Sequence, residues 1–287
     1  MKKVMIITDL EGCSGTEGAP DGALGNRVFN DEKSVNCLTR EINACIDGLR
    51  EGGAEKILVW DLHGGGFNFS ANSLRPGVEM CMTHEPLCHV SFLDAGFCAH
   101  VILGAHARQG VPDGYLNHTR NSHMVSRIIV NGQEVGESEL SMLRAAFYRV
   151  PTILVAGDYA ACRNALAFHG KPLETVVCKR GFSRYSVMHY PPEKVLAEIR
   201  EKSCRAIRKL SDYKPLKVEE NFEVIYQVFC PNQMVPFIQR GAEMLDGTTV
   251  RLRGRDAIDC YAQLCGWNAG IHNRHFHISA QTDSLFE

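Results

Sequence analysis

The sequence has no apolar run that approaches the roughly 18 residues of a membrane-spanning helix. It also has no excess of charge, because 31 lysines and arginines stand against 33 aspartates and glutamates, and the net charge is −2. Binding to nucleic acid or to a membrane surface favours a strongly basic protein, so we expect neither partner. The 12 cysteines include no Cys-x-x-Cys pair, which argues against a zinc–cysteine cage.

The cysteines and the start of the chain predict a cytoplasmic protein. Cysteines scattered over 287 residues are expected to be reduced thiols that pack as small apolar side chains. The first residues, Met1 to Lys3, lead straight into an apolar run and show no small-residue cleavage site of a secretory signal.

Short apolar runs alternate with segments of helical periodicity in the first part of the chain. Buried strands are predicted at 4–7, 56–60, 101–103, 151–156 and 175–178. Helices are predicted from a cap at Asp31 or Ser34 to Gly52, from 138 to 148, and after Asp158. A loop is expected at 13–27 and a hairpin at 126–135. Strands that alternate with helices favour an α/β fold with a mostly parallel sheet flanked by helices.

The pattern changes near Pro191 and Pro192. Helices are predicted beyond this point at 193–210, 232–245 and 256–266, and strands at 222–229 and 248–252. We therefore predict an α/β metal-binding catalytic domain at 1–190. A smaller α+β C-terminal domain is predicted at 191–287, and we expect it to take part in assembly.

Three of the predicted strands end in side chains that bind metals in other proteins. Asp9 and Glu11 follow the first strand, His63 follows the second, and His106 follows the third. The carboxyl ends of parallel strands share one edge of an open α/β sheet, where ligands bind. One shared metal site explains three such strand ends better than three independent coincidences. For Asp9 and Glu11 taken alone, a turn acid and a helix-capping acid are an equal alternative.

Two further candidates follow along the chain, Glu137 just ahead of a predicted helix and His118 in a loop. Glu137 also suits an acid in the first helical turn, beside the helix dipole. A catalytic zinc ion with an open position uses about three protein ligands, so five firm ligands suit two ions that share a carboxylate. These five are Asp9, Glu11, His63, His106 and Glu137.

The candidates stand in motifs that resemble those of the zinc-dependent D-aminopeptidase family, the DppA type. In chain order the motifs are Asp9-x-Glu11-Gly12, Asp61-x-His63, Gly104-x-His106-Ala107-Arg108, Asn117-His118-Thr119, Val135-Gly136-Glu137 and Val155-Ala156-Gly157-Asp158. The likeness in order and spacing runs from residue 1 to about residue 185 and is weaker beyond.

The resemblance implies a role for each matched residue. It implies that the carboxylate of Asp9 bridges two zinc ions and that Glu11 and His63 complete one zinc site. By the same resemblance, a second site is completed by two ligands, His106 and Glu137. His118 would be the catalytic histidine, and the protein would form a ring-stacked decamer whose sites face an inner cavity.

Two positions depart from the family pattern. Ile7 stands where the family usually carries serine, and three glycines follow His63. Neither change removes a ligand, but both lie close to the predicted site and bear on substrate preference.

Other polar residues are interpreted as structural. We expect Asp61 to orient a histidine or a loop, and Asp158 to cap a helix. Lys179 and Arg184 are assigned to a solvated charged face. The histidines without a partner pattern are assigned structural roles: His84, His89, His100, His123, His169 and His189. The last three histidines are assigned to a frayed terminus: His272, His275 and His277.

The sequence thus predicts a metal-dependent hydrolase, namely a binuclear zinc aminopeptidase that removes N-terminal residues, D-residues included, from short peptides or aminoacyl amides. His118 is expected to act as general base or as donor to an oxyanion, and nucleophilic attack by it stays open. A homo-oligomer is expected, since closed symmetry is common among such proteins.

Two alternatives remain at this point. The first is another binuclear hydrolase, such as an amidase, a deacylase or a phosphoesterase. A phosphoesterase needs cations near the metals, and Arg108 is the obvious candidate. The second is a non-catalytic metal-binding ring protein, although none of the expected ligands is missing.

Overall fold

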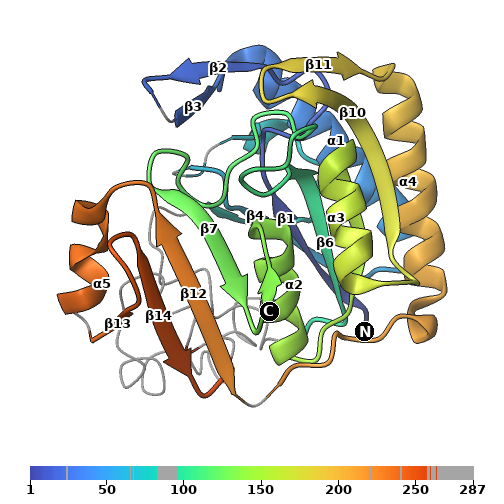
Figure 1. Ribbon diagram of the computed structural model, residues 1–287. Helices are drawn as coiled ribbons and strands as arrows, with labels where there is room; N and C mark the ends of the chain where they lie inside the picture. The colour runs from blue at the N-terminus through green and yellow to red at the C-terminus, as the bar shows by residue number, and fades with distance from the viewer. Residues whose placement is uncertain are drawn as a thin grey trace.

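The computed structural model describes residues 1–23, 25–64, 66, 68–82, 96–219, 221–239, 241–256, 259 and 263. The main sheet in this part of the chain consists of β1 Lys3–Thr8, β4 Lys56–Asp61, β5 Glu79–Met82, β6 Ala99–Ala105, β9 Thr152–Asp158, β10 Glu174–Ser183 and β11 Ser186–His189. Its strand order is β11-β10-β9-β6-β1-β4-β5 (Figure 1). Neighbouring strands pair in parallel, except for β10 and β11.

Helices cover both faces of this sheet: α1 Glu32–Glu51, α2 Glu137–Phe147, α3 Tyr159–His169 and α4 Pro192–Arg208. On one face α1 and α4 pack against each other, and α2 and α3 pack on the other face. Val4 and Ile6 of β1 belong to the core under α1 and α4, while Met5 and Ile7 belong to the core under α2. This burial of both faces explains the continuous apolar run of β1.

A second, antiparallel sheet lies beside the first (Figure 1). It consists of β7 Val125–Val130, β8 Gln133–Glu134, β12 Phe222–Val228, β13 Glu243–Met244 and β14 Thr249–Gly254, in the order β13-β14-β12-β7-β8. Its core includes Phe237 of α5 Val235–Gln239 and Leu140 of α2. Buried and half-buried residues alternate along β12, as its sequence pattern predicts.

The remaining elements are small. A hairpin is formed by β2 Gly18–Asp21 and β3 Gly25–Val28, and short 3-10 helices span Ala71–Ser73, Leu210–Asp212 and Pro231–Met234. None of the helices in the described part of the chain combines the length and the apolar character that crossing a membrane requires.

The mixed α/β class is confirmed, and the main sheet is largely parallel as predicted. The two sheets do not follow the predicted division at residue 190. The second sheet takes β7 and β8 from before this point and β12 to β14 from after it, while α4 packs on α1 and β10. Separate domains at 1–190 and 191–287 therefore stay a prediction.

Local signals placed several elements correctly. The carboxylate of Asp31 accepts a hydrogen bond from the backbone N–H of Ser34 at 2.8 Å and caps α1. The hairpin turn at Asn131 and Gly132 connects β7 to β8 as expected.

Other expectations were wrong. The predicted loop at 13–27 contains the β2–β3 hairpin, whose short strands lack an apolar alternation. The predicted helix at 232–245 shrinks to a 3-10 turn and α5, because Pro236 supplies no N–H group and Gly241, at φ +90°, ends the helical segment. The strand predicted at 175–178 extends to Ser183, and β5 and β11 were missed. Most of the helix predicted at 256–266 lies outside the described residues.

Candidate metal centre

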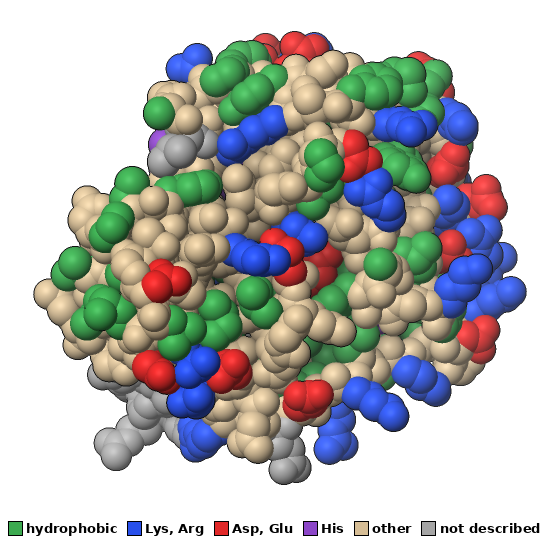
Figure 2. All heavy atoms as spheres, viewed as in Figure 1, with side chains coloured by type: hydrophobic (Ala, Val, Ile, Leu, Met, Phe, Trp, Pro, Cys, Tyr) green, Lys and Arg blue, Asp and Glu red, His purple; other side chains and the backbone are tan. Residues whose placement is uncertain are grey.

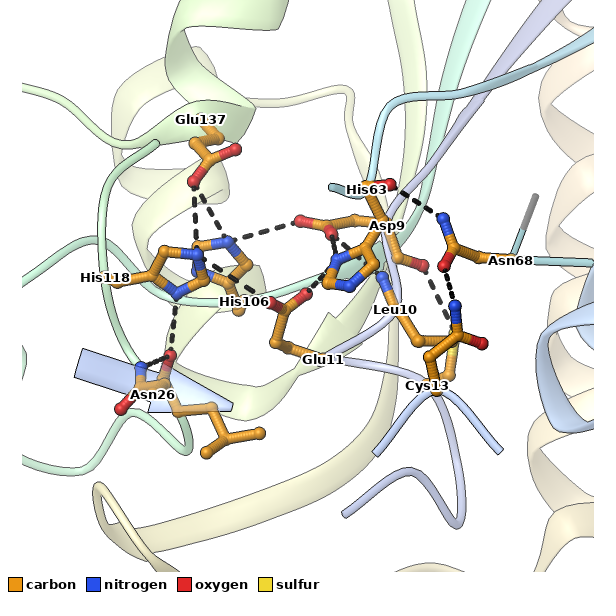
Figure 3. A network of polar contacts seen from close by, with 12 residues as sticks. Asp9, Leu10, Glu11, Cys13, Asn26, His63, Asn68, His106, His118 and Glu137 are labelled. Carbon is orange, nitrogen blue, oxygen red and sulfur yellow. Dashed lines mark hydrogen bonds and ion pairs between the residues drawn. The ribbon is translucent and has the colours of Figure 1, made fainter. Parts of the chain in front are cut away.

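The predicted candidates meet at one edge of the main sheet. β1 pairs with both β4 and β6, so the residues that follow these three strands become neighbours in space. Asp9 follows β1, His63 follows β4 and His106 follows β6, and all three point toward a common centre (Figure 3). Glu11 joins them from the turn after β1, and Glu137 from the first residue of α2.

Glycines allow the ends of β1 and β6 to approach so closely. Gly104 has φ +72°, and a Cβ atom there would stand 1.9 Å from the carbonyl oxygen of Asp9. A Cβ at Gly12 would stand 2.0 Å from the carbonyl oxygen of Ala105. Instead, the N–H of Gly12 donates to the carbonyl of Gly104 at 2.9 Å. The glycines of these two motifs therefore hold the acidic turn against the histidine strand.

Asp9 lies between two histidines. Its Oδ1 is 2.9 Å from Nδ1 of His63, and its Oδ2 is 3.2 Å from Nε2 of His106. Glu11 Oε2 is 3.0 Å from Nδ1 of His63, and Glu137 Oε1 is 3.2 Å from Nε2 of His106. Two groups of three potential metal ligands result, and both contain Asp9.

The hydrogen bond on the far side of His106 shows which ring nitrogen carries its proton. Nδ1 lies 2.9 Å from the carbonyl oxygen of Ala107, which can only accept, so Nδ1 donates. In the neutral ring, Nε2 then turns a lone pair toward the carboxylate oxygens of Asp9 and Glu137. Within the described residues neither Nε2 of His106 nor Oε2 of Glu11 finds a hydrogen-bond partner. Lone pairs that face one another in a buried site need a cation between them.

The shifted pKa values of these residues reflect the same close approach of carboxylates and imidazoles. Burial and the neighbouring carboxylate of Glu11 raise the pKa of Asp9 to about 7. Burial alone would lower the pKa of His106, but the carboxylates of Asp9 and Glu137 raise it well above its ordinary value. Burial opposes the charge of Glu137 in the same way, yet the charge of His106 lowers its pKa to about 2. Nitrogen and oxygen ligands of this kind suit zinc, which would take the place of the shared protons.

His118 lies over this cluster. Its ring stacks on that of His106 with 4.0 Å between centroids and 9° between planes. Its Nδ1 donates to the carbonyl oxygen of Leu116 at 2.9 Å, and its Nε2 is 3.7 Å from both Glu11 and Glu137. Burial and the charge of His106 lower its pKa, so His118 presents an unprotonated Nε2. Glu11, His106 and His118 also form a third group of potential ligands.

Asp61 supports His63, as expected. The buried carboxylate of Asp61 accepts hydrogen bonds from the backbone N–H groups of His63 at 3.2 Å and Asn68 at 2.7 Å. The side-chain amide of Asn68 donates to the carbonyl oxygen of His63 at 2.7 Å. These bonds fix the turn that carries the histidine.

Lys179 is not on a solvated face, so that expectation was wrong. Its side chain is fully buried, and its ammonium donates to the carbonyl oxygens of Glu11 at 2.7 Å and Thr16 at 2.8 Å. Nearby, the buried carboxylate of Glu41 accepts from the N–H of Ser14 at 2.7 Å. Lys179 and Glu41 therefore hold the turn that carries Glu11. In the sequence, the one sign of Lys179 and Glu41 is that each is a polar residue inside an apolar periodicity.

Asp158 does not cap its helix, contrary to expectation. It stands at the N-cap position of α3 but makes no side-chain capping bond. Its carboxylate instead accepts from the N–H groups of Tyr115 at 3.3 Å and Gly181 at 3.1 Å, and so supports the loop that carries His118. Arg184 is half-buried, and its Nε and Nη2 atoms are buried, so it too departs from the expected solvated face.

The other histidines fall into three groups. His100 binds Thr152 and Ser141, His169 bonds to the carbonyl of Gly170, and His189 accepts from the N–H of Gly15, in keeping with structural roles. His123 lies 3.4 Å from the carboxylate of Asp21 and lines the cavity described next, so its structural assignment stays a prediction. The remaining histidines lie outside the described residues: His84, His89, His272, His275 and His277. Arg108, the candidate for a phosphate contact, instead pairs with Glu134 at 3.1 Å.

A cavity of about 510 Å³ opens beside the metal residues. This volume lies in the usual range of small-molecule sites. Its wall includes Asp9, Glu11, His63, His118 and Glu137, together with the β3 strand and the first turns of α2. Ile7 and Gly64, the two departures from the family pattern, also line it. The candidates therefore face a space that a substrate can enter.

The comparisons with known proteins agree with this geometry. The peptidase family described as D-aminopeptidase matches residues 1–265. A D-aminopeptidase of Bacillus subtilis is 28% identical over 263 residues, which cover 90% of this chain and 94% of the relative. A solved structure of the Zn-dependent D-aminopeptidase DppA from Bacillus subtilis, described as a self-compartmentalizing protease, matches with a TM-score of 0.82. That match has 28% identity and covers 92% of this chain and 95% of the other. The chain thus belongs to the D-aminopeptidase family, and the predicted class of enzyme, a metal-dependent aminopeptidase, is confirmed.

Proposed function

We propose that the chain is a binuclear zinc aminopeptidase in which Asp9 would be a ligand of both ions. One ion would be held by Asp9, Glu11 and His63, and the other by Asp9, His106 and Glu137. The observation that carries this proposal is the position of Asp9, whose two oxygens lie 2.9 Å and 3.2 Å from two different histidines. Zinc in these positions supplies Lewis-acid polarisation of a carbonyl and lowers the pKa of water.

His118 would move the proton. Its Nδ1–H is committed to the carbonyl of Leu116, and its lowered pKa keeps Nε2 unprotonated near pH 7. A neutral imidazole at the mouth of the ligand cluster suits a general base that takes a proton from the attacking water and later returns it to the leaving amine. Stacking on His106 and the support of Asp158 beneath the loop would hold the ring in this orientation.

The substrate would be a short peptide or aminoacyl amide with a free amino terminus. The relative of known structure is described as a D-aminopeptidase, and we extend the preference for D-residues to this chain. Because Ile7 and Gly64 line the cavity, they are the positions at which this preference would differ from that of relatives.

We also propose a homo-oligomer in the cytoplasm. The relative is described as self-compartmentalizing. The family resemblance of the sequence motifs implies a ring-stacked decamer. The segment 191–287 offers apolar side chains that are each at least 40% exposed, gathered over α5 and β13 (Figure 2): Val235, Ile238, Met244 and Leu245. The cysteines of the described residues are free thiols, as a reducing compartment requires. Sedimentation as a 31.9 kDa monomer at micromolar concentration would contradict the assembly.

The test of the function combines metal analysis with paired substrates. Purified protein should contain about two zinc equivalents per chain and release alanine from D-alaninamide, with L-alaninamide as the matched substrate. Chelation should abolish turnover, and zinc should restore it. One equivalent in fully loaded, active protein would overturn the two-ion site. Two equivalents without turnover of either enantiomer would favour the non-catalytic alternative.

A further inference from the structure

The ring of His118 is oriented through one backbone carbonyl group, that of Leu116. This oxygen accepts two hydrogen bonds, one from Nδ1 of His118 at 2.9 Å and one from the side-chain amide of Asn26 at 2.7 Å. His118 therefore lies between Glu137 on one side and Asn26 on the other (Figure 3). Asn26 is part of β3, far from His118 in the sequence, and belongs to none of the family motifs.

The loop that carries His118 has an unfavourable backbone conformation on both sides of the histidine. Leu116 has φ +49° and Arg120 has φ +63°, in the left-handed region that residues with a Cβ atom rarely adopt. Leu116 is fully buried, and its N–H donates to the carbonyl of Arg184 at 2.8 Å. Such a conformation persists only where the surrounding structure over-determines it. The direction of the Leu116 carbonyl therefore depends on groups outside the loop.

The amide of Asn26 clamps two successive peptide groups of this loop. Its Nδ2 atom carries two hydrogens and donates to the carbonyl oxygens of Leu116 at 2.7 Å and Asn117 at 3.3 Å. Its Oδ1 accepts from the hydroxyl of Tyr185 at 2.9 Å. Carbonyl oxygens can only accept, so these contacts fix which way the amide points. The backbone N–H of Asn26 also donates to Oγ of Ser122 at 3.0 Å, on the other side of the histidine.

We propose that Asn26 is a positioning residue for the proton transfer by His118. Asn26 holds the carbonyl of Leu116 in the place from which this oxygen fixes the Nδ1–H tautomer and the plane of the ring, so that Nε2 faces the metal residues. Asn26 itself lines the cavity, but both donor hydrogens of its amide already serve the loop carbonyls. It therefore acts through the loop and not through a hydrogen bond donated to substrate. This inference rests on the role of His118 proposed above.

The test separates the reaction rate from substrate binding. Asn26→Ala and Asn26→Leu both remove the two donors. In each, kcat for the aminoacyl amide should fall roughly tenfold to a hundredfold, because a misplacement of about 1 Å can cost a hundredfold. KM and zinc content should stay close to the parent values, and a melting curve shows that the variant is folded. An unchanged kcat in both variants, or an effect confined to KM, would overturn the inference.

Tyr185→Phe is the matched control. It removes a hydroxyl that donates to Oδ1 of Asn26 and to the carbonyl oxygen of Gly25, the latter at 3.2 Å, but leaves both amide donors on the loop. Its kcat should therefore stay close to that of the parent. A fall in kcat as large as that of Asn26→Ala would show that attachment of the β2–β3 hairpin sets the rate, and would contradict the role given to the amide.

A double-mutant cycle shows whether the effect passes through His118. In the His118→Ala background, Asn26→Ala should leave the residual kcat unchanged, because no ring remains to be oriented. Additive losses would mean that Asn26 acts independently of His118, against the inference. The cycle also separates the two proposals. Full activity of His118→Ala would remove the proton-transfer role itself, whereas a slow His118→Ala beside an Asn26→Ala at the parent rate would remove only the role of Asn26.

Discussion

The turns that carry Glu11 and His63 are held by buried charged side chains, whereas His106 and Glu137 are held mainly by backbone groups. The turn of Glu11 is held by Lys179 of β10, and the turn of His63 by Asp61 at the end of β4. His106 is oriented by the carbonyl oxygen of the next residue, and Glu137 accepts from the N–H of Arg120 at 2.6 Å. The helix N-terminus adds a favourable field for the carboxylate of Glu137.

The two proposed metal positions should therefore differ in how strongly remote substitutions affect them. The first position, formed with Glu11 and His63, rests on buried charged groups whose loss is costly. The second position rests on backbone geometry that substitution of a side chain leaves in place. We therefore expect remote substitutions to weaken the first position selectively, and only the shared Asp9 to affect both.

The largest effect is expected for Asp9→Ala. Both proposed ions lose a ligand, so zinc content should fall from about two equivalents to less than one. The loss of turnover should exceed the roughly 10²–10⁴-fold that a proton-transfer group contributes. Metal analysis after dialysis, next to a rate measurement, checks both expectations. The matched control is Glu137→Gln, which should release only the second ion. Equal metal loss in the two variants would show that Asp9 does not bridge.

His118→Ala should give the next largest effect. Turnover should fall roughly 10²–10⁴-fold while both ions and the melting temperature are kept, because the ring moves a proton without holding metal. If His118 is a ligand instead, as the third group of potential ligands allows, metal and melting temperature should fall together. Both quantities are measured on one sample. Undiminished turnover would exclude either role.

The proposed ligands of both positions could be predicted from the sequence. Asp9, Glu11, His63 and His106 directly follow apolar strands, and parallel strands bring such ends together whatever the details of packing. The family motifs added Glu137. The fold class followed from the same alternation of strands and helices.

The supporting residues could not be found in this way. Lys179 and Glu41 stand inside apolar periodicities, but this pattern does not show which turn they support. Only the pairing of β10 with β9 brings Lys179 beneath Glu11. Asp158 at a helix start is read as a cap because local signals cannot show a long-range acceptor role. Long-range pairing, which depends on the whole topology, was the missing information.

A smaller effect is expected for Asp61→Asn, which should weaken zinc binding at only one of the two proposed positions. The amide keeps the shape but cannot accept from both Asn68 and His63 as the carboxylate does. Loss of a group that orients a ligand usually costs 10–100-fold in metal affinity, and here only one of the two ions should be affected. Competition with a chelator measures the two affinities. Asp158→Asn is the matched control, since this buried carboxylate supports the His118 loop and should leave both affinities unchanged. Equal weakening of both ions by Asp61→Asn would remove the distinction.

The smallest expected effect is a dependence of the stability of the metal-free protein on pH. The folded-state pKa values of His63 and His106 lie well above the ordinary 6.5, and that of Asp9 is about 7 rather than 3.8. Groups with a raised pKa stabilise the folded state below their unfolded pKa and lose this contribution as the pH rises through the folded value. The metal-free protein should therefore become less stable as the pH rises from 6.5 to 8.5.

In the loaded protein, zinc would replace the protons on these three residues. The difference in melting temperature between loaded and metal-free protein should widen over this range. The loaded protein is the proper control because it shares every cysteine and lysine that titrates at higher pH. Histidines with a lowered folded-state pKa, such as His118, add a slope of the opposite sign, which fades above about pH 7.5, where the unfolded-state imidazole has lost its proton. His63→Gln and His106→Gln should each reduce this widening of the melting-temperature difference. His63→Gln acts at the first proposed position and His106→Gln at the second. A difference that stays constant would show that shared protons do not stand in for metal in this cluster.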